Sequence, residues 1–97
     1  MRKITNKISL DSRLKRAPDV ISTDLNGEEV ILNLSTGTYF GLDPVGARVW
    51  QLLKKGMTLR EVFRVMIGEY DVEENRLQAD LLGIAGDLNE NGLVEDA

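Results

Sequence analysis

The chain has 97 residues, of which 42% are hydrophobic and 29% charged, and it contains neither cysteine nor histidine. This length suits one domain with a single hydrophobic core. The missing cysteines exclude disulfides, zinc knuckles and thiol nucleophiles, and the missing histidines exclude a Ser-His-Asp triad and the commonest transition-metal ligand. We therefore expect a chain that is not an enzyme by itself and that uses no cofactor or metal ion.

Charge is divided unevenly along the chain. The first 16 residues carry six basic side chains and one acidic one, whereas residues 17–97 carry six basic and fifteen acidic ones. An acidic body opposes nucleic-acid binding, so no nucleic-acid partner is expected. The basic segment 1–17 is either a solvated terminal arm without fixed structure or a handle for an acidic partner, and 18–97 form the domain. Three apolar residues of the segment offer a way to pack part of it on that domain: Ile4, Ile8 and Leu10.

The sequence carries no signal for membrane insertion or secretion. No apolar run approaches the roughly 20 residues that a membrane span needs. The basic terminus is not followed by the apolar stretch of a secretory signal peptide. We therefore expect a cytoplasmic protein without a membrane partner.

Two strands joined by a tight turn are predicted at the start of the domain. Residues 20–25 (VISTDL) and 28–34 (EEVILNL) are rich in β-branched and aliphatic side chains. Asn26-Gly27 joins them, and this pair best tolerates the positive φ angles of a type I′ turn. The sequence therefore predicts a β-hairpin over residues 20–34.

The second of these strands has an alternating pattern, and a third strand follows it. The apolar set, which we expect to face the core, is Val30, Leu32 and Leu34. The alternate set, which we expect to face away, is Glu29, Ile31 and Asn33. A loop that ends with Gly37 in a left-handed conformation leads to a short strand at 38–42. The result is an antiparallel meander whose last strand has an unpaired edge.

The hydrophobic period then changes to that of helices. Asp43-Pro44 opens a helix over residues 44–55, because Asp is a good N-cap and Pro is favoured at the first helical position. A capping box at 58–61 opens a second helix that ends near residue 70. A third helix begins at 71–74 and stops at Asn91-Gly92, and its apolar stripe consists of Leu77, Leu81, Ile84 and Leu88. Three strands followed by three helices predict an α+β domain of winged-helix type.

A winged-helix composition raises the question of DNA binding. Residues 72–97 contain one basic side chain, Arg76, and seven acidic ones. Such a helix repels a phosphate backbone instead of reading base edges. An acidic scaffold or transcription factor and a subunit that only stabilises a larger enzyme remain as alternatives. The acidic clusters also lack the spacing of a calcium loop.

Two glycines lie inside the third predicted helix, Gly83 and Gly86, where each costs about 1 kcal/mol relative to alanine. With Ala79 they form a stripe of small residues. Either this helix packs tightly on its own sheet, or the stripe borders a groove between the helix and strand 38–42. An unpaired strand edge beside such a groove is suited to bind an extended peptide as an added strand.

The sequence resembles the PqqD-like family, the recognition elements of ribosomally synthesised and modified peptides. The resemblance is carried by residues 28–62 (EEVILNLSTGTYFGLDPVGARVWQLLKKGMTLREV), by EYDV at 69–72, by Asp80 and by NENGLV at 89–94. It covers residues 18–95, and its most specific part runs from Thr36-Gly37 to Leu53. This part looks closest to the stand-alone B1 proteins of lasso-peptide pathways.

The resemblance implies a non-catalytic domain that binds the leader peptide of a precursor as a strand added to 38–42, against the third helix. It also implies delivery of that peptide to a leader peptidase or cyclase, or, in the alternative, to a radical-SAM enzyme of PQQ synthesis. The implied peptide-binding residues are Thr38, Tyr39, Phe40, Gly41, Leu42, Leu77, Asp80, Leu81 and Gly83. A place in the core remains an alternative role for four of the singled-out residues, Tyr39, Trp50, Leu77 and Leu81.

Overall fold

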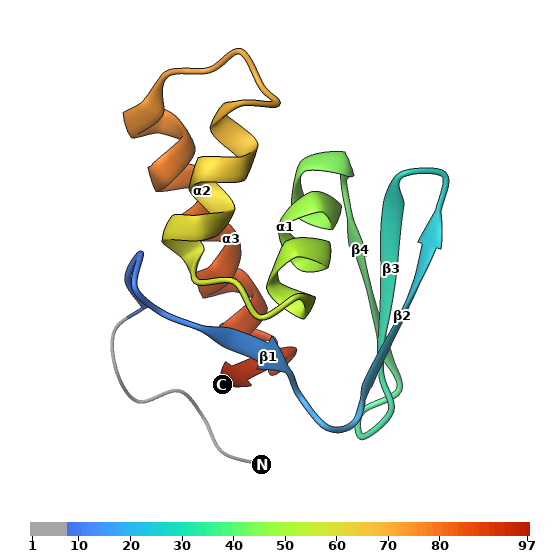
Figure 1. Cartoon of the computed structure of the whole chain (residues 1–97). Coiled ribbons are helices and arrows are strands. Elements are labelled where there is room, and N and C mark those ends of the chain that lie inside the picture. The colour runs from blue at the N-terminus through green and yellow to red at the C-terminus, as the bar shows by residue number, and fades with distance from the viewer. Residues whose placement is uncertain (1–7) are drawn as a thin grey trace.

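A computed structural model describes residues 8–97 and shows a small sheet packed against three helices (Figure 1). The elements are β1 (Leu14–Arg16), β2 (Val20–Leu25), β3 (Glu28–Asn33), β4 (Thr38–Leu42), α1 (Pro44–Lys54), α2 (Leu59–Ile67), α3 (Glu74–Glu90) and β5 (Val94–Asp96). β2, β3 and β4 form an antiparallel sheet in that order, and β1 pairs with β5 in a separate two-stranded sheet. The predicted α+β fold is confirmed, whereas β1 and β5 were not anticipated. In the described part of the chain, no helix is both long and apolar enough to cross a membrane.

The turns of the sheet adopt the predicted backbone conformations. Asn26 and Gly27 have φ angles of 57° and 87°, as a type I′ hairpin requires. Gly37 has a φ of 72° and precedes β4 in the left-handed conformation expected of it. β3 ends at Asn33, one residue earlier than predicted, because the chain turns there: the N–H of Gly37 donates to the carbonyl oxygen of Asn33 at 2.8 Å.

The helix ends are set by the predicted capping residues. Oδ1 of Asp43 accepts from the N–H of Gly46 at 2.8 Å, and Thr58 and Glu61 form a reciprocal capping box. The hydrogen bond from the Thr58 N–H lowers the pKa of the Glu61 carboxyl below its ordinary value. Leu93 folds back on the last turn of α3, where its N–H donates to the carbonyl of Leu88 at 2.9 Å. α2 ends at Ile67, before the predicted residue 70, because residues 68–70 tighten into a hydrogen-bonded turn.

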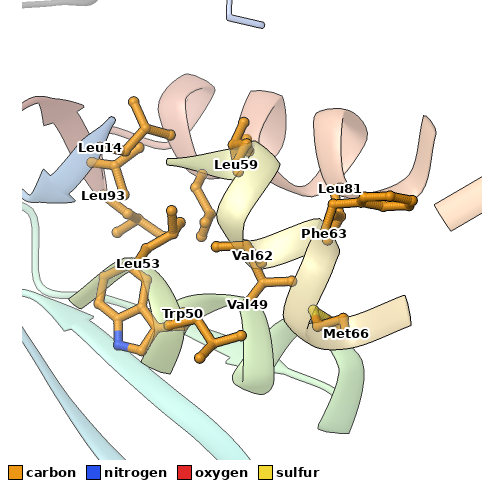
Figure 2. Close-up of a cluster of buried hydrophobic side chains, with 14 of the residues drawn as sticks. Leu14, Val49, Trp50, Leu53, Leu59, Val62, Phe63, Met66, Leu81 and Leu93 are labelled. Atoms are coloured by element: carbon orange, nitrogen blue, oxygen red, sulfur yellow. The ribbon is translucent and has the colours of Figure 1, made fainter. Parts of the chain in front are cut away.

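The core lies where the three helices meet (Figure 2). Trp50 of α1 is its largest fully buried side chain, so the core interpretation of this residue holds. The indole N–H of Trp50 donates to Oγ of Ser22 at 3.0 Å, which satisfies a buried donor and ties α1 to β2. Packed with it in the same cluster are Leu14, Val49, Leu53, Leu59, Val62, Met66, Leu81 and Leu93.

An ion pair holds α1 against the end of α2. Nε of Arg48 donates to Oε1 of Glu69 at 3.0 Å, and Nη2 of the same guanidinium donates to Oε2. The hydrogen bonds from Arg48 lower the pKa of the Glu69 carboxyl, and those to Glu69 raise the pKa of Arg48. This bidentate contact joins α1 to the turn that follows α2.

The predicted core face of β3 is wrong. Ile31 is fully buried, with Glu29 and Asn33 buried on either side of it, whereas Val30 and Leu32 are only half-buried and Leu34 is exposed. The reason is that α1 packs on the face that carries Ile31 and, opposite it across the ladder, Ser22. Both alternating sets of β3 contain aliphatic residues, so the pattern did not determine which set α1 would cover.

The N-terminal segment joins the domain as far as the structure describes it. Leu14 in β1 lies opposite Asp96 in β5, and both Leu14 and Ala17 are buried. Ile8 and Leu10 pack against the core, while Ile4 lies outside the described residues. The structure therefore places residues 8–17 on the domain that was expected to begin at residue 18.

Two basic side chains of this segment have acidic neighbours within the fold. Nη2 of Arg13 lies 3.8 Å from Oε1 of Glu61, and Nζ of Lys15 lies 3.7 Å from Oε1 of Glu95. Exposed pairs of this kind contribute at most about 1 kcal/mol each. The basic segment thus complements part of the acidic body of its own chain.

Candidate functional site

β4 forms one edge of the three-stranded sheet. It pairs with β3 and, within residues 8–97, with no second strand. In an antiparallel ladder, successive residues direct their N–H and C=O groups alternately toward and away from the neighbouring strand. Every second residue of Thr38–Leu42 therefore presents its backbone groups away from β3. The strand contains neither Lys nor Pro, which commonly blunt such edges.

A groove runs beside this edge, between β4, the start of α1 and α3. One hollow of about 470 Å³ is lined by residues 39–42, Asp43, Gly46, Ile84, Asp87, Leu88, Asn91 and Leu93. A second hollow of about 440 Å³ continues along α3 and is lined by Asp43, Val45, Ala79, Asp80, Gly83, Ile84 and Asp87. Because the two hollows share three lining residues, they form one continuous depression, which we call the β4–α3 groove.

The groove combines apolar walls with acidic side chains. Its apolar lining comes from both sides, and consists of Phe40, Leu42, Val45, Ile84, Leu88 and Leu93. Its charged lining residues are Asp43, Asp80 and Asp87, with no Lys or Arg among them. Residues 8–97 hold no cluster of three side chains arranged to ligate a metal ion. The groove is therefore suited to bind apolar side chains of a ligand whose own charges are neutral or positive.

The glycines of α3 open toward solvent instead of packing on the sheet. A Cβ atom built on Gly83 or Gly86 meets no atom within 4 Å. The interpretation that these glycines allow close packing on the sheet is therefore wrong. The close backbone approach is at Gly46 in α1, where a Cβ would lie 3.4 Å from Oδ1 of Asp43 and from Leu42. Gly83 lines the groove, whereas Gly86 is not among its lining residues.

The structure brings most of the predicted site residues to the groove. Phe40, Gly41 and Leu42 line it from β4, and Asp80 and Gly83 line it from α3. Tyr39 borders it, but the register opposite Leu32 places the Tyr39 side chain on the outer sheet face.

Three predicted residues lie elsewhere. Thr38 is exposed at the start of β4 and is not among the groove-lining residues. Leu77 and Leu81 are buried in the core, in agreement with the core role that was kept open for them. Neither side chain is exposed to the groove in this structure.

Several lining residues were missed from the sequence. Asp80, Ile84, Asp87 and Asn91 follow one another at helical spacing, so Asp80 was a signal for the others. The core assignment of Leu88 is confirmed, because this side chain is buried in the core cluster and only borders the groove. Ile84 was assigned to the same core stripe but is half-buried and lines the groove, because periodicity does not distinguish a covered apolar side chain from one at the edge of a stripe. The lining role of Gly46 had no sequence signal that we recognise.

Comparisons with known proteins identify the family to which the chain belongs. The family model for coenzyme PQQ synthesis protein D (PqqD) matches residues 28–94. The chain belongs to the PqqD family, as its sequence suggested. No curated protein sequence matches it.

Two solved structures share the fold. One, described as TbiB1 in complex with the TbiA(beta) leader peptide, is 38% identical, with a TM-score of 0.80 over 84% of this chain and 94% of that one. The other, described as lasso peptide synthetase B1 complexed with the leader peptide, is 24% identical, with a TM-score of 0.81 over 87% of this chain and 99% of that one. The expected likeness to lasso-peptide B1 proteins is confirmed.

Proposed function

We propose that this chain binds the leader peptide of a ribosomally made precursor as an additional strand along β4, in the groove against α3. The chain then delivers the peptide to a leader peptidase or cyclase of lasso-peptide biosynthesis, in the cytoplasm and without catalysing a reaction itself. The observation that carries the proposal is an open strand edge directly beside an apolar groove. The likeness to TbiB1, a protein whose structure contains a leader peptide, supports it.

The groove explains why β4, and not β2, is the proposed site. Both strands are edges of the sheet within the described residues. An added strand gains main-chain hydrogen bonds at either edge, but side-chain pockets give the specificity. Phe40 and Leu42 on β4 and Ile84 and Leu88 on α3 line such a pocket at the β4 edge.

The charges of the groove limit which peptide segments it accepts. Asp80 and Asp87 lie on the same side of α3, and Asp43 lies across from them at the start of α1. An acidic peptide side chain inserted between them would be repelled, whereas apolar and basic side chains are compatible. The leader segment that binds should therefore be poor in Asp and Glu at its groove-facing positions.

A second candidate function is that of a peptide chaperone for a radical-SAM enzyme of PQQ synthesis. It is favoured by the description of the matching family model. The two candidates share the peptide-binding site and differ in the enzyme that receives the peptide. The likeness to the B1 protein at 38% identity favours the lasso pathway.

Fluorescence polarisation with labelled leader peptides tests the proposal. The precursors encoded beside this chain supply the peptides, and a scrambled leader of the same composition is the control. We expect saturable binding of one leader, competition by the unlabelled leader, and no competition by the scrambled peptide. If none of the neighbouring precursors binds, the proposed function is refuted.

A further inference from the structure

The face of the sheet that points away from α1 is apolar and uncovered in the described part of the chain (Figure 1). Ile21, Leu32 and Tyr39 lie opposite one another across the three strands and therefore share this face. The N–H of Leu34 donates to the carbonyl of Asp19 at 2.8 Å, so Leu34 continues the alternation of β3 on the same side. We call this surface the outer sheet patch: Ile21, Leu25, Val30, Leu32, Leu34 and Tyr39.

This patch holds most of the large apolar side chains that are exposed among residues 8–97. The exposed large hydrophobic side chains among residues 8–97 are Ile21 (48%), Leu25 (53%), Leu34 (57%), Tyr39 (68%) and Val72 (43%), and four of these five belong to the patch. Single exposed apolar residues are normal on protein surfaces, whereas a contiguous set marks an interaction site. None of these side chains belongs to the core cluster, because α1 packs on the other face of the sheet.

The charge around the patch indicates what kind of surface covers it. Residues 17–47, which include strands β2, β3 and β4, contain no basic side chain, and two of their five acidic residues, Asp19 and Glu28, lie at the patch. Glu28 lies opposite Leu25 at one end of the patch, and Asp19 lies beside Leu34 at the other. Two copies packed through this face would bring these like charges together, which disfavours a homodimer. A partner with an apolar centre and Lys or Arg at its edge is complementary.

We propose that the outer sheet patch docks the enzyme that processes the bound peptide, through an apolar surface of that enzyme edged by Lys and Arg. This inference rests on the proposed function, because it concerns the enzyme that receives the leader. A peptide added to β4 extends the same sheet, and Tyr39 belongs to the patch while it also borders the groove. An enzyme on the outer face therefore reaches the peptide without entering the groove.

Biolayer interferometry with the processing enzyme encoded beside the chain tests this docking surface. The test variant is the double substitution Ile21→Ser and Leu34→Ser, which removes apolar area far from the groove. The matched control is Val72→Ser, which changes the exposed apolar residue outside the sheet. We expect the double variant to bind the enzyme at least tenfold more weakly and Val72→Ser to bind as the natural chain does. Glu28→Lys should slow association, and Asp71→Lys, far from the sheet, should not.

Peptide binding and oligomeric state are measured on the same samples, so that a failure of the proposed function is distinguished from a failure of the docking surface. The double variant should bind the leader like the natural chain, because neither substituted residue lines the groove. If the natural chain itself does not bind the leader, the proposed function is refuted. The docking surface is judged separately, by the binding of the enzyme. Enzyme binding that is unaffected by the double substitution, or undetectable for the natural chain, would overturn the inference. A dimer in sedimentation that the double substitution dissociates would also overturn it, because a second copy would then cover the patch.

Discussion

Replacing Gly83 by arginine is expected to abolish leader binding without destabilising the fold. A Cβ atom at this position has no atom within 4 Å, so a side chain can extend from α3 into the groove. Three aspartates line the same hollow: Asp43, Asp80 and Asp87. The guanidinium then pairs with these carboxylates and occupies the space of the peptide. We expect an affinity loss of about 30-fold or more, the effect of a binding hot spot of about 2 kcal/mol. Fluorescence polarisation with the labelled leader measures it.

The same helix supplies a matched control. Gly86→Arg introduces the same side chain at a second open position, but Gly86 is not a groove-lining residue. Arginine has a higher helix propensity than glycine by nearly 1 kcal/mol, so both variants should unfold at the same or a slightly higher temperature. Gly86→Arg should keep its leader affinity within about threefold, a change of less than 1 kcal/mol. Normal leader binding by Gly83→Arg would show that the groove is not the site.

Blocking the backbone of β4 should produce an alternating loss of binding. Proline has no N–H group, so at a residue whose N–H points away from β3 it removes one hydrogen bond to the added strand. The ring also crowds that strand, and we expect roughly tenfold weaker binding for a loss of about 1.4 kcal/mol. Proline at the alternate residues of Thr38–Leu42 removes a bond to β3 instead and should lower the unfolding temperature.

A parallel proline scan over β2 is the control, because β2 is the opposite edge of the same sheet. No well-folded β2 variant should lose affinity. N-methylated leader peptides test the same ladder from the peptide side and leave the protein unchanged, so they avoid variants that fail to fold. Affinity losses at every second N-methylated position are expected. Uniform tolerance of N-methylation along the leader would contradict strand addition.

Local chemistry made the turns and helix ends of this fold predictable. Asn26-Gly27 and the capping box at Thr58 and Glu61 act over two to four residues, and the structure has them as expected. The pairing of β1 with β5 was not predictable in this way, because each strand has three residues and they lie at opposite ends of the chain. Nothing in such short segments indicates a distant partner.

The failed prediction for β3 has a different cause. Val30, Leu32 and Leu34 do form an apolar alternation, but on the face that α1 covers Ile31 is the one apolar residue of β3, and buried Glu29 and Asn33 flank it. Apolar side chains normally face the core, and apolar residues on an uncovered sheet face depart from this pattern. Such departures are expected where a protein binds a partner. The same residues therefore misled the prediction of the core and now define the outer sheet patch.

The site was predictable where backbone features defined it. The unpaired edge at Thr38–Leu42 and the glycine at position 83 both follow from the sequence. Both border the groove, with the exception of Thr38. Ile84 was not separable from the core stripe to which Leu88 belongs, because only the packing of α3 against α1 and α2 shows which side of that stripe stays open. Tertiary packing thus determines which side chains of α3 line the groove.

The most direct test of strand addition is an isotope-filtered NOE experiment with the labelled chain and an unlabelled leader peptide. The account predicts contacts between peptide backbone protons and the backbone of Thr38–Leu42, together with contacts from alternate peptide side chains to the methyl groups of Ile84 and Leu88. Contacts to β2 in place of β4, or a peptide that shows helical contacts within itself, would contradict it.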